Sequence, residues 1–409
     1  AGDAAGAEAE ARAAMRAGLD APETWLLLGR TLEGQGRYDE AEAALREAVK
    51  RRPDYADAHD DLAQLVWRRT GDVAAATAAL DAAPPSVPLT VLKARALEFA
   101  GNPAGALAVL KRSLEAQGER PGLLAAAAHA AGAIEPDAGL AWARRAAALA
   151  PNDRGVLTTL CEAELAAGEA AAALATAERL CASSPDDQLA LAHRSTAARL
   201  GGDPTGLGLE DYGLVRAWRL PTPAGWPSLE AFLADLAAAL QPLHDLGAHP
   251  IGQSLRGGSQ TQRDLRRLPD PAIRAFFETV QVPIGEHLAW LGTGADPVRR
   301  RNRGGFRFAG VWSVRLRPHG FHADHVHPRG WLSSAFYVAL PPAVRGDGRE
   351  GWIRFGAPGT PTRPGLEAGH AVRPEPGMLV LFPSYMWHGT IPFGGEASRM
   401  TIAFDLVPA

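Results

Sequence analysis

Hydrophobic and polar positions follow different patterns in the two halves of this 409-residue chain. From Ala1 to about Arg199, stretches rich in Ala, Leu and Glu alternate with turn residues at regular intervals, which is typical of an array of short helices. Around residues 201–204 the Ala content falls, and Trp, Pro and Gly become more frequent. We therefore predict one domain over residues 1–202 and a second over residues 203–409.

The turn residues of the first half recur with a step of about 34 residues. Pro53 maps near Pro88, two steps from Pro53 reach Pro121, and Pro151 and Pro185 are again 34 residues apart. A generic Ala-rich bundle would share the composition but not this step, so we predict about five helix pairs. Glycines suited to the tight turns within the pairs are Gly36, Gly71, Gly101 and Gly168.

The first well-marked pair resembles a tetratricopeptide repeat (TPR). The positions that carry the resemblance are Trp25, Leu28, Gly29, Ala41, Leu45, Ala48 and Pro53. Gly29 and Ala41 would let the paired helices approach closely, and Pro53 would end the second helix. Stacked pairs of this kind form a concave surface, so the resemblance implies a peptide or protein partner for the first domain.

The second half begins with a helical lead-in, predicted over residues 203–297. Ser228–Leu243 is predicted as an amphipathic helix with Ser228 as its N-cap. Apolar residues at helical spacing predict another helix over Pro271–Leu291, which Pro283 should kink or split.

After Arg303 the hydrophobic period becomes two, as in strands. Many short strands without intervening helices favour a closed or sandwiched antiparallel sheet such as a jelly roll, predicted over residues 303–409. After an alternating stretch that begins at Phe306, the predicted strands are Trp331–Leu340, Trp352–Phe355, Met378–Phe382, His388–Ile391 and Met400–Leu406.

Composition and charge narrow the range of functions. Hydrophobic residues make up 46% of the chain and charged residues 22%, which are ordinary values for a globular protein. A net charge of −4 gives no electrostatic reason to expect a nucleic-acid partner. The basic run at residues 299–303 is interpreted as a solvated approach to a strand.

Cysteine content and hydropathy bear on the cellular setting. The chain has two cysteines, Cys161 and Cys181, which exclude a disulfide framework and a zinc site built from cysteines. Reduced, partly buried thiols fit a cytoplasmic protein. We also expect no membrane partner, because no apolar run reaches membrane-spanning length.

The strongest candidate chemistry lies in a cluster of histidines. In an extended segment, residues i and i+2 point to the same side, so His325 and His327 can converge on one metal ion. His388 lies 61 residues beyond His327, at the head of a later predicted strand. Two adjacent ligands and one distant ligand would form a three-ligand face that leaves coordination positions open.

Arg399 and Thr401 share one face of the last predicted strand. A guanidinium pairs with a carboxylate through two hydrogen bonds, and a neighbouring hydroxyl can add a third. A metal centre beside a buried arginine suits a dicarboxylate that chelates iron at one end, and 2-oxoglutarate is such a cosubstrate. Tyr337 could also reach the cosubstrate carboxylate, or it could be a buried tyrosine with a local partner.

From about Asp203 to the C-terminus, the chain resembles the 2-oxoglutarate- and iron(II)-dependent oxygenases that follow TPR arrays. The segments that carry the resemblance are residues 250–261, 320–341, 382–388 and 398–405. It implies a double-stranded β-helix (jelly-roll) fold, with Fe(II) and 2-oxoglutarate as cofactor and cosubstrate. By motif match, the metal positions fall on His325, His327 and His388, and Arg399 falls on the cosubstrate position.

A second ligand set remains open. The wider superfamily uses two histidines and one carboxylate, and the chain contains a His-x-Asp sequence at His322 and Asp324. The set His322, Asp324 and His388 therefore competes with the set that contains His325 and His327. With the latter set, Asp324 or His322 could orient a ligand instead.

Three other features near the site have competing interpretations. Trp331 and Trp387 flank it, and we expect both to be core residues rather than substrate contacts. The polar segment 253–261 is interpreted as a loop, either over the mouth of the barrel or as a structural Ω-loop.

We expect the chain to be an Fe(II)- and 2-oxoglutarate-dependent dioxygenase, most simply a hydroxylase. Its substrate would be a peptide, a protein or a carrier-bound molecule recruited by the TPR domain. The alternatives are a non-catalytic binding scaffold and a cupin-like metalloenzyme that does not use 2-oxoglutarate. Arg399 and Thr401 would have no common task in the cupin-like enzyme.

Overall fold

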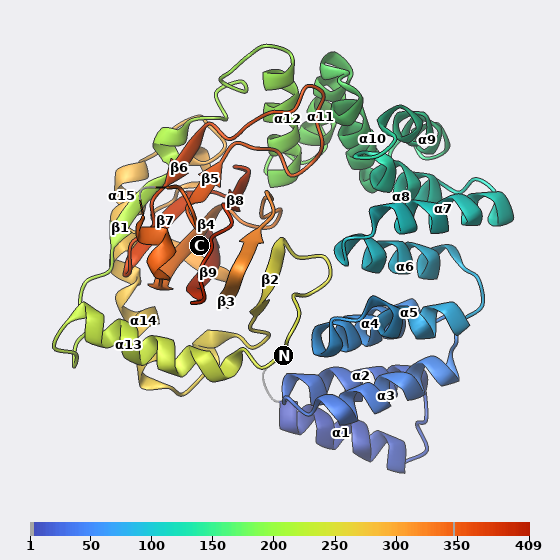
Figure 1. Ribbon diagram of the computed structural model, residues 1–409, viewed down its shortest axis with the longest axis horizontal. Coiled ribbons are helices and arrows are strands. Elements are labelled where there is room, and N and C mark those ends of the chain that lie inside the picture. The colour runs from blue at the N-terminus through green and yellow to red at the C-terminus, as the bar shows by residue number, and fades with distance from the viewer. Residues whose placement is uncertain (1–3, 347) are drawn as a thin grey trace.

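The computed structural model describes residues 4–346 and 348–409, so the first three residues of the predicted first domain lie outside the described part. The N-terminal half is a curved array of paired helices (Figure 1). Its helices are α1 (Ala4–Arg16), α2 (Pro22–Gly34), α3 (Tyr38–Arg51), α4 (Ala56–Thr70), α5 (Val73–Ala82), α6 (Val87–Phe99), α7 (Pro103–Gln117), α8 (Pro121–Ala131), α9 (Pro136–Leu149), α10 (Arg154–Ala167), α11 (Ala170–Ser183) and α12 (Gln188–Leu200).

Small residues bring the paired helices together as the sequence predicts. A Cβ atom on Gly29 would lie 2.7 Å from the Leu45 side chain, so α2 and α3 could not pack as they do with a larger residue there. Ala41 is fully buried at the same contact. The four glycines predicted in tight turns all have positive φ angles, which glycine adopts without strain.

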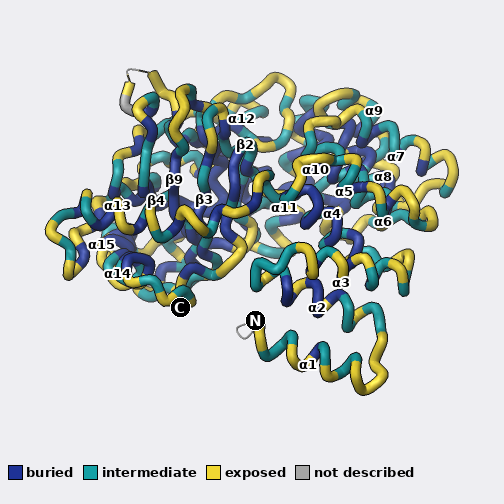
Figure 2. The backbone as a smooth tube through the Cα atoms, turned by 60° about the horizontal axis from the view of Figure 1, so that its bottom comes forward, coloured by how far each residue is buried: buried dark blue, intermediate teal, exposed yellow. Residues whose placement is uncertain are grey.

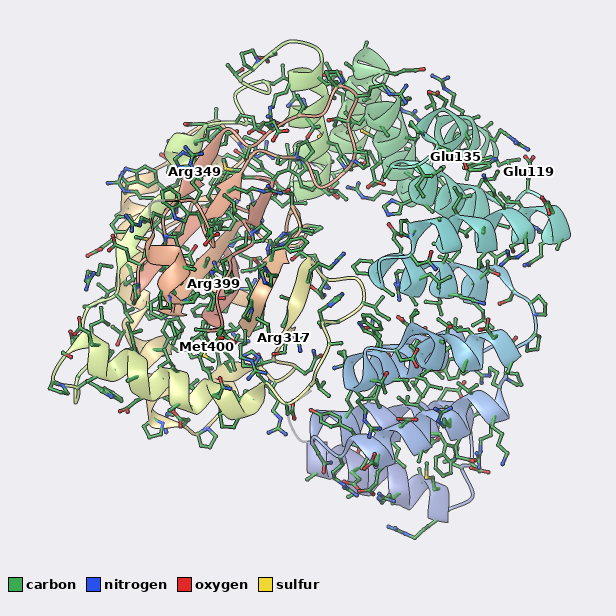
Figure 3. All side chains as sticks on the ribbon, viewed as in Figure 1. Glu119, Glu135, Arg317, Arg349, Arg399 and Met400 are labelled. Carbon is green, nitrogen blue, oxygen red and sulfur yellow. The ribbon has the colours of Figure 1, made fainter. Side chains whose placement is uncertain are left out.

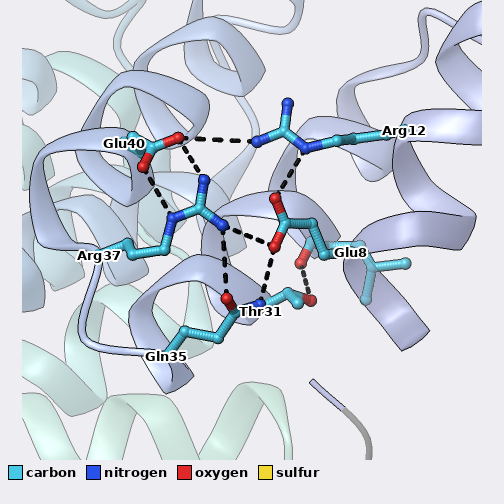
Figure 4. Close-up of polar contacts among 7 residues, drawn as sticks. Glu8, Arg12, Thr31, Gln35, Arg37 and Glu40 are labelled. Atoms are coloured by element: carbon cyan, nitrogen blue, oxygen red, sulfur yellow. Dashed lines mark hydrogen bonds and ion pairs between the residues drawn. The ribbon is translucent and has the colours of Figure 1, made fainter. Parts of the chain in front are cut away.

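A polar network joins α1 to the pair formed by α2 and α3 (Figure 4). The Glu8 carboxylate accepts hydrogen bonds from Arg12 at 2.7 Å, Gln35 at 2.9 Å and Arg37 at 2.7 Å. These donors favour the ionised carboxylate and lower the pKa of Glu8 to about 2. Arg37 also pairs with Glu40 at the start of α3, so one guanidinium links α1 to α3.

The C-terminal half is built on antiparallel sheets, which confirms the predicted fold class of a helical array followed by a jelly-roll domain. One sheet has the strand order β1-β7-β4-β9-β3-β2, and a smaller one has the order β6-β5-β8. The strands are β1 (Arg216–Arg219), β2 (Leu255–Gln260), β3 (Phe306–His322), β4 (Leu332–Ala339), β5 (Ile353–Phe355), β6 (His370–Val372), β7 (Met378–Pro383), β8 (His388–Thr390) and β9 (Arg399–Pro408).

Helices α13 (Leu229–Leu240), α14 (Pro271–Thr279) and α15 (Gln281–Leu291) pack against the larger sheet. Ser228 is the N-cap of α13, as predicted, and its hydroxyl accepts a hydrogen bond from the Ala231 amide. The predicted helix over Pro271–Leu291 is split, but at Val280 rather than at Pro283. Pro283 lies in the first turn of α15, where the missing N–H group costs no helical hydrogen bond.

The interpretation of residues 253–261 as a loop is wrong. Leu255–Gln260 forms strand β2, which pairs with β3 at the edge of the larger sheet. Glycine is required for this pairing, because a Cβ atom on Gly258 would lie 2.4 Å from the Arg315 carbonyl oxygen. The sequence did not predict this strand because its glycines and polar side chains show no apolar alternation, and a strand at the edge of a sheet can form without it.

The helical array contacts the sheet domain near both of its ends. On α4, Gln64 exchanges two hydrogen bonds of 2.9 Å with the backbone of Ile251, and Trp67 donates to the His249 carbonyl group. On α12, Ala192 packs in a buried cluster with Val326 and Trp387. Buried residues are concentrated in the central strands and in the contacts between paired helices (Figure 2). None of the described helices is both long and apolar enough to span a bilayer.

Candidate functional site

A cavity of about 680 Å³ opens in the sheet domain between β3, β9 and β8. Among the residues that line it are His322, His325, His327, His388 and Arg399. Most of the candidate metal ligands and cosubstrate-binding residues predicted from the sequence therefore line one cavity. In Figure 3, Arg399 lies within the sheets, while Glu119 and Glu135 lie at the far edge of the helical array.

Backbone pairing brings the distant histidine to the adjacent pair. His325 and His388 form an isolated antiparallel bridge with N–H···O distances of 2.9 and 3.0 Å. The amide of His327 donates to the Ser384 carbonyl group at 3.0 Å, so residues 325–327 run as a short strand beside residues 384–388. Side chains of directly opposite residues are close in such a pair, and the His325 and His388 rings are 4.2 Å apart.

His325, His327 and His388 form the group among the described residues with a geometry suited to a metal ion. One nitrogen from each ring lies within 4.8 Å of the others. Each Nδ1 lies beside an oxygen that can only accept: the Ala323 carbonyl group for His325, the Met386 carbonyl group for His388 and the Asp405 carboxylate for His327. Nδ1 therefore carries the proton, and each Nε2 keeps a lone pair for a ligand.

The protonation state of the rings agrees with this role. Burial lowers the pKa of His325 to about 3, and burial with its neighbouring imidazoles lowers the pKa of His388 well below the usual value. The two rings are therefore neutral near pH 7. A neutral imidazole is the form that binds divalent first-row metals, so the donor set fits the iron that the resemblance implies.

The residues of the second ligand set are placed differently. Both oxygens of the Asp324 carboxylate accept hydrogen bonds from the Arg354 guanidinium, and Asp324 does not line the cavity. His322 lines the cavity, but its Nδ1 is 3.0 Å from the Ser254 hydroxyl and its ring lies 5.8 Å from that of His325. The structure thus brings His325, His327 and His388 together and leaves Asp324 outside the group.

Arg399 is a buried cation without a carboxylate partner. Its residue is 2% exposed, no acidic group of the described chain pairs with it, and its Nε has no hydrogen-bond partner. The guanidinium lies 5.0 Å from the centre of the Tyr337 ring. Burying an unpaired charge is costly, so this arrangement favours an anionic ligand in the cavity.

The other two candidate cosubstrate residues, Thr401 and Tyr337, differ in their access to the cavity. Thr401 lines the cavity on the same face of β9 as Arg399, as predicted. Tyr337 is opposite Thr401 in the pairing of β4 with β9, is fully buried and does not line the cavity. Its hydroxyl has no hydrogen-bond partner among the described residues.

Asp405, which was not predicted as a site residue, lines the same cavity. Its Oδ2 accepts a hydrogen bond of 2.9 Å from His327 Nδ1, and its Oδ1 accepts one of 2.8 Å from the Ser333 hydroxyl. A signal was available in the alternation of the strand. Residues 399, 401, 403 and 405 share one face of β9, and all four line the cavity.

The two tryptophans have the core positions expected for them. Trp331 is 1% exposed and donates its indole N–H to the Val298 carbonyl group. Trp387 donates to the Thr196 hydroxyl group of α12 at 2.9 Å, so it fastens the helical array beside His388. Neither ring lines the cavity.

Comparison with protein families matches both halves of the chain. Residues 310–405 match the family described as "Putative 2OG-Fe(II) oxygenase". Residues 1–42 and 26–89 match a tetratricopeptide repeat family. The resemblance stated from the sequence is therefore confirmed for these segments, and the oxygenase match includes all three clustered histidines and Arg399. No curated protein sequence matches the chain.

Solved structures similar to the chain include proteins of both kinds. A prolyl-4-hydroxylase from Pseudomonas putida is 20% identical and aligns over 48% of this chain and 96% of its own, with a TM-score of 0.31. A TPR protein from Thermus thermophilus is 23% identical over 44% of this chain and 98% of its own, with a TM-score of 0.33. A tetratricopeptide repeat protein from Parabacteroides merdae is 14% identical over 54% and 87%, with a TM-score of 0.37.

Proposed function

We propose that this protein is an Fe(II)- and 2-oxoglutarate-dependent dioxygenase, most simply a hydroxylase. The observation that carries the proposal is the joint lining of one cavity by three convergent imidazoles and a buried arginine without an acidic partner. A cupin-like enzyme without a dicarboxylate cosubstrate would leave Arg399 buried and uncompensated.

In this proposal His325, His327 and His388 hold the iron through Nε2, and Arg399 binds the distal carboxylate of 2-oxoglutarate. Thr401 lies on the same strand face as Arg399 and would add a hydrogen bond to that carboxylate. The iron, when bound together with 2-oxoglutarate, supplies the coupling of oxidative decarboxylation to oxidation of a substrate C–H bond.

We further propose that the inner face of the helical array recruits a polypeptide or carrier-bound substrate. Helices α6, α8 and α10 line a second cavity of about 400 Å³, with mainly apolar walls. This face is turned toward the sheet domain (Figure 1). The two parts also touch there, because the Arg256 guanidinium lies 4.6 Å over the Phe99 ring. A concave surface of stacked repeats is the usual binding surface of such arrays.

A row of titratable side chains runs along the same face toward the metal cavity. His129 on α8 lies 3.5 Å from Glu98 on α6 and 2.9 Å from Glu162 on α10, and these carboxylates raise its pKa well above the usual value. Glu162 is 3.8 Å from His193 on α12, whose ring lies 5.9 Å from that of Trp387. His193 and Trp387 are buried, so this row connects the inner face to the residue that precedes His388 through packed side chains.

The oxygenase proposal is tested by binding under anaerobic conditions. Protein loaded with Fe(II) is titrated with 2-oxoglutarate and followed for the weak visible metal-to-ligand charge-transfer band, and admission of O₂ should then release succinate. If no band appears and 2-oxoglutarate does not bind, the proposal is wrong.

Iron binding by two single-residue variants decides between the two ligand sets. His325→Ala should abolish iron binding, whereas His322→Ala should retain it, because His322 lies outside the convergent group. Iron content after gel filtration measures both. The reverse result would assign the iron to the set with His322 and Asp324.

A further inference from the structure

We infer that Asp405 is a positioning residue that supplies the metal centre with its negative charge through His327. The inference rests on the proposed metal site. It explains how a centre with three histidine ligands can replace one with two histidines and a carboxylate. Asp405 touches neither the metal nor the cosubstrate in this assignment, and it acts through the ring of His327.

The geometry gives Asp405 two well-formed hydrogen bonds. Oδ2 accepts from His327 Nδ1 at 2.9 Å, and Oδ1 accepts from Ser333 Oγ at 2.8 Å. Ser333 Oγ is in turn 2.8 Å from Ser384 Oγ, and the Ser384 carbonyl group accepts the His327 amide proton. The carboxylate and the backbone of its histidine are thus held by one connected network.

His327 differs from the other two candidate ligands in the group that accepts its Nδ1 hydrogen bond. His325 and His388 donate Nδ1–H to the carbonyl groups of Ala323 and Met386, which are neutral. Of the three rings, the one that donates to a carboxylate is that of His327. A carboxylate at this position makes the imidazole a stronger electron donor and fixes its orientation toward the metal.

The sum of the charges expected when the metal and 2-oxoglutarate are bound also supports the proposed role of Asp405. Asp405 is the only acidic residue among the described residues that line it. Asp324 is compensated by Arg354 outside the cavity wall. Of the two arginines that line the cavity, Arg329 is exposed, so its charge is solvated, and Arg399 is buried. A divalent metal and Arg399 bring three positive charges to the buried part of the site, and 2-oxoglutarate brings two negative ones. The carboxylate of Asp405 brings the total to zero, and a buried site is costly unless its charges are compensated.

Co(II) binding to the apo protein, without 2-oxoglutarate and followed by visible absorption, tests the inference. Two substitutions separate charge from shape. Asp405→Asn keeps the size and loses the charge, while Asp405→Glu keeps the charge and changes the size. We expect Asn to weaken Co(II) binding by about 10–100-fold and Glu to weaken it less, since loss of such a partner commonly costs this much affinity.

The ranking of the two variants decides the outcome. If Asn binds Co(II) as well as the wild type, or better than Glu, the role of Asp405 is structural and the inference is wrong. Ser333→Ala removes one hydrogen bond and leaves the charge, so it should stay within about threefold of the wild type. A loss in Ser333→Ala as large as that in Asp405→Asn would also overturn the inference. If Asp405→Asn does not fold, a loss of about tenfold or more in Ser333→Ala relative to the wild type overturns it instead.

Failure of the metal site itself would look different. If the wild-type protein binds no Co(II), the proposed function fails together with the inference. If the wild type binds Co(II) and the order of Asn and Glu is reversed, only the role of Asp405 fails. Urea unfolding of each apo variant shows whether an affinity change accompanies a change in stability.

Discussion

At the residue scale, the sequence located the convergent histidines because their spacing has a direct geometric meaning. His325 and His327 are two apart in an extended segment, and His388 lies directly opposite His325. The sequence could not decide between the two ligand sets, because His322 and Asp324 have a ligand spacing of their own. The ion pair of Asp324 with Arg354, 30 residues away, is a tertiary contact that no local pattern shows.

Replacing Arg399 by Leu should separate binding from stability. The variant should lose 2-oxoglutarate binding and keep its metal, since Arg399 lies outside the histidine group. The apo protein should become more stable by about 1–4 kcal/mol, because an uncompensated buried cation is removed. Calorimetry of 2-oxoglutarate binding and urea unfolding measure the two effects.

A matched control for this substitution is Arg307→Leu, which changes an exposed arginine on β3. It should alter neither cosubstrate binding nor stability by more than about 0.5 kcal/mol. Loss of metal in Arg399→Leu, or a lower stability of its apo form, would contradict the assignment of Arg399 as an anion-binding residue.

At the element scale, hydrophobic periodicity predicted the strands that bury apolar side chains and missed those that do not. β4, β7 and β9 were found to within a residue or two, because their buried positions are mostly apolar. β2 was missed because it is polar and rich in glycine. β1 was missed as well, and its Trp218 is held by a hydrogen bond to the ring of His287 on α15.

The contact of β1 with α15 should make stability depend on pH. Trp218 Nε1 donates to His287 Nδ1 at 3.1 Å, and burial lowers the pKa of His287 to about 4. The unfolded chain, in which a histidine titrates near a pH of about 6.5, binds the proton more strongly. Stability should therefore be constant above a pH of about 6.5 and fall below it by about 1.4 kcal/mol per pH unit for this group, until about pH 4.

His287→Met removes this titration and should make the fall of stability between about pH 6.5 and about pH 5 less steep by about 1.4 kcal/mol per pH unit. Urea unfolding of the apo protein at several pH values measures the slope, and the wild type is compared with the variant in the same buffers. His244, whose burial also lowers its pKa to about 4, should leave part of the slope in place. An unchanged slope in His287→Met would show that this contact does not carry the effect.

At the scale of the whole molecule, the helical array and the sheet domain are in contact, and the proposed polypeptide-binding face of the array lies on the side of the sheet domain. Contacts from α4 and from α12 hold the two halves together near both ends of the array. The inner face of α6, α8 and α10 is thereby turned toward the sheet domain (Figure 1). The predicted boundary at residues 202 and 203 stays a prediction, although α12 ends just before it at Leu200.

Filling the inner cavity of the array should block recruitment without affecting the metal site. Gly122 lies on α8 at the wall of this cavity, and a side chain added there would meet open space. Gly122→Trp should therefore fold, retain 2-oxoglutarate binding and lose the ability to select polypeptides from a random displayed peptide library. Sequencing of the selected peptides provides the readout.

Gly285→Trp is the matched control, because Gly285 is a helical glycine of α15 that also faces open space. This variant should select the same peptides as the wild type. Equal selection by Gly122→Trp, or no selection by any of the three proteins, would contradict recruitment by the inner face. The oxygenase proposal would be unaffected in either case.

The sequence by itself determined the features that depend on local spacing. These are the period of the helix pairs with their turn glycines, the alternation of the apolar strands, and the shared faces of His325 with His327 and of Arg399 with Thr401. Each follows from backbone geometry within a few residues. Tertiary structure decided which groups meet across long separations: His388 with His325, Arg354 with Asp324, and Asp405 with His327. These contacts depend on strand register and packing. The carboxylate of Asp405 reaches His327 because β9 pairs with β3 and β4 in one particular register.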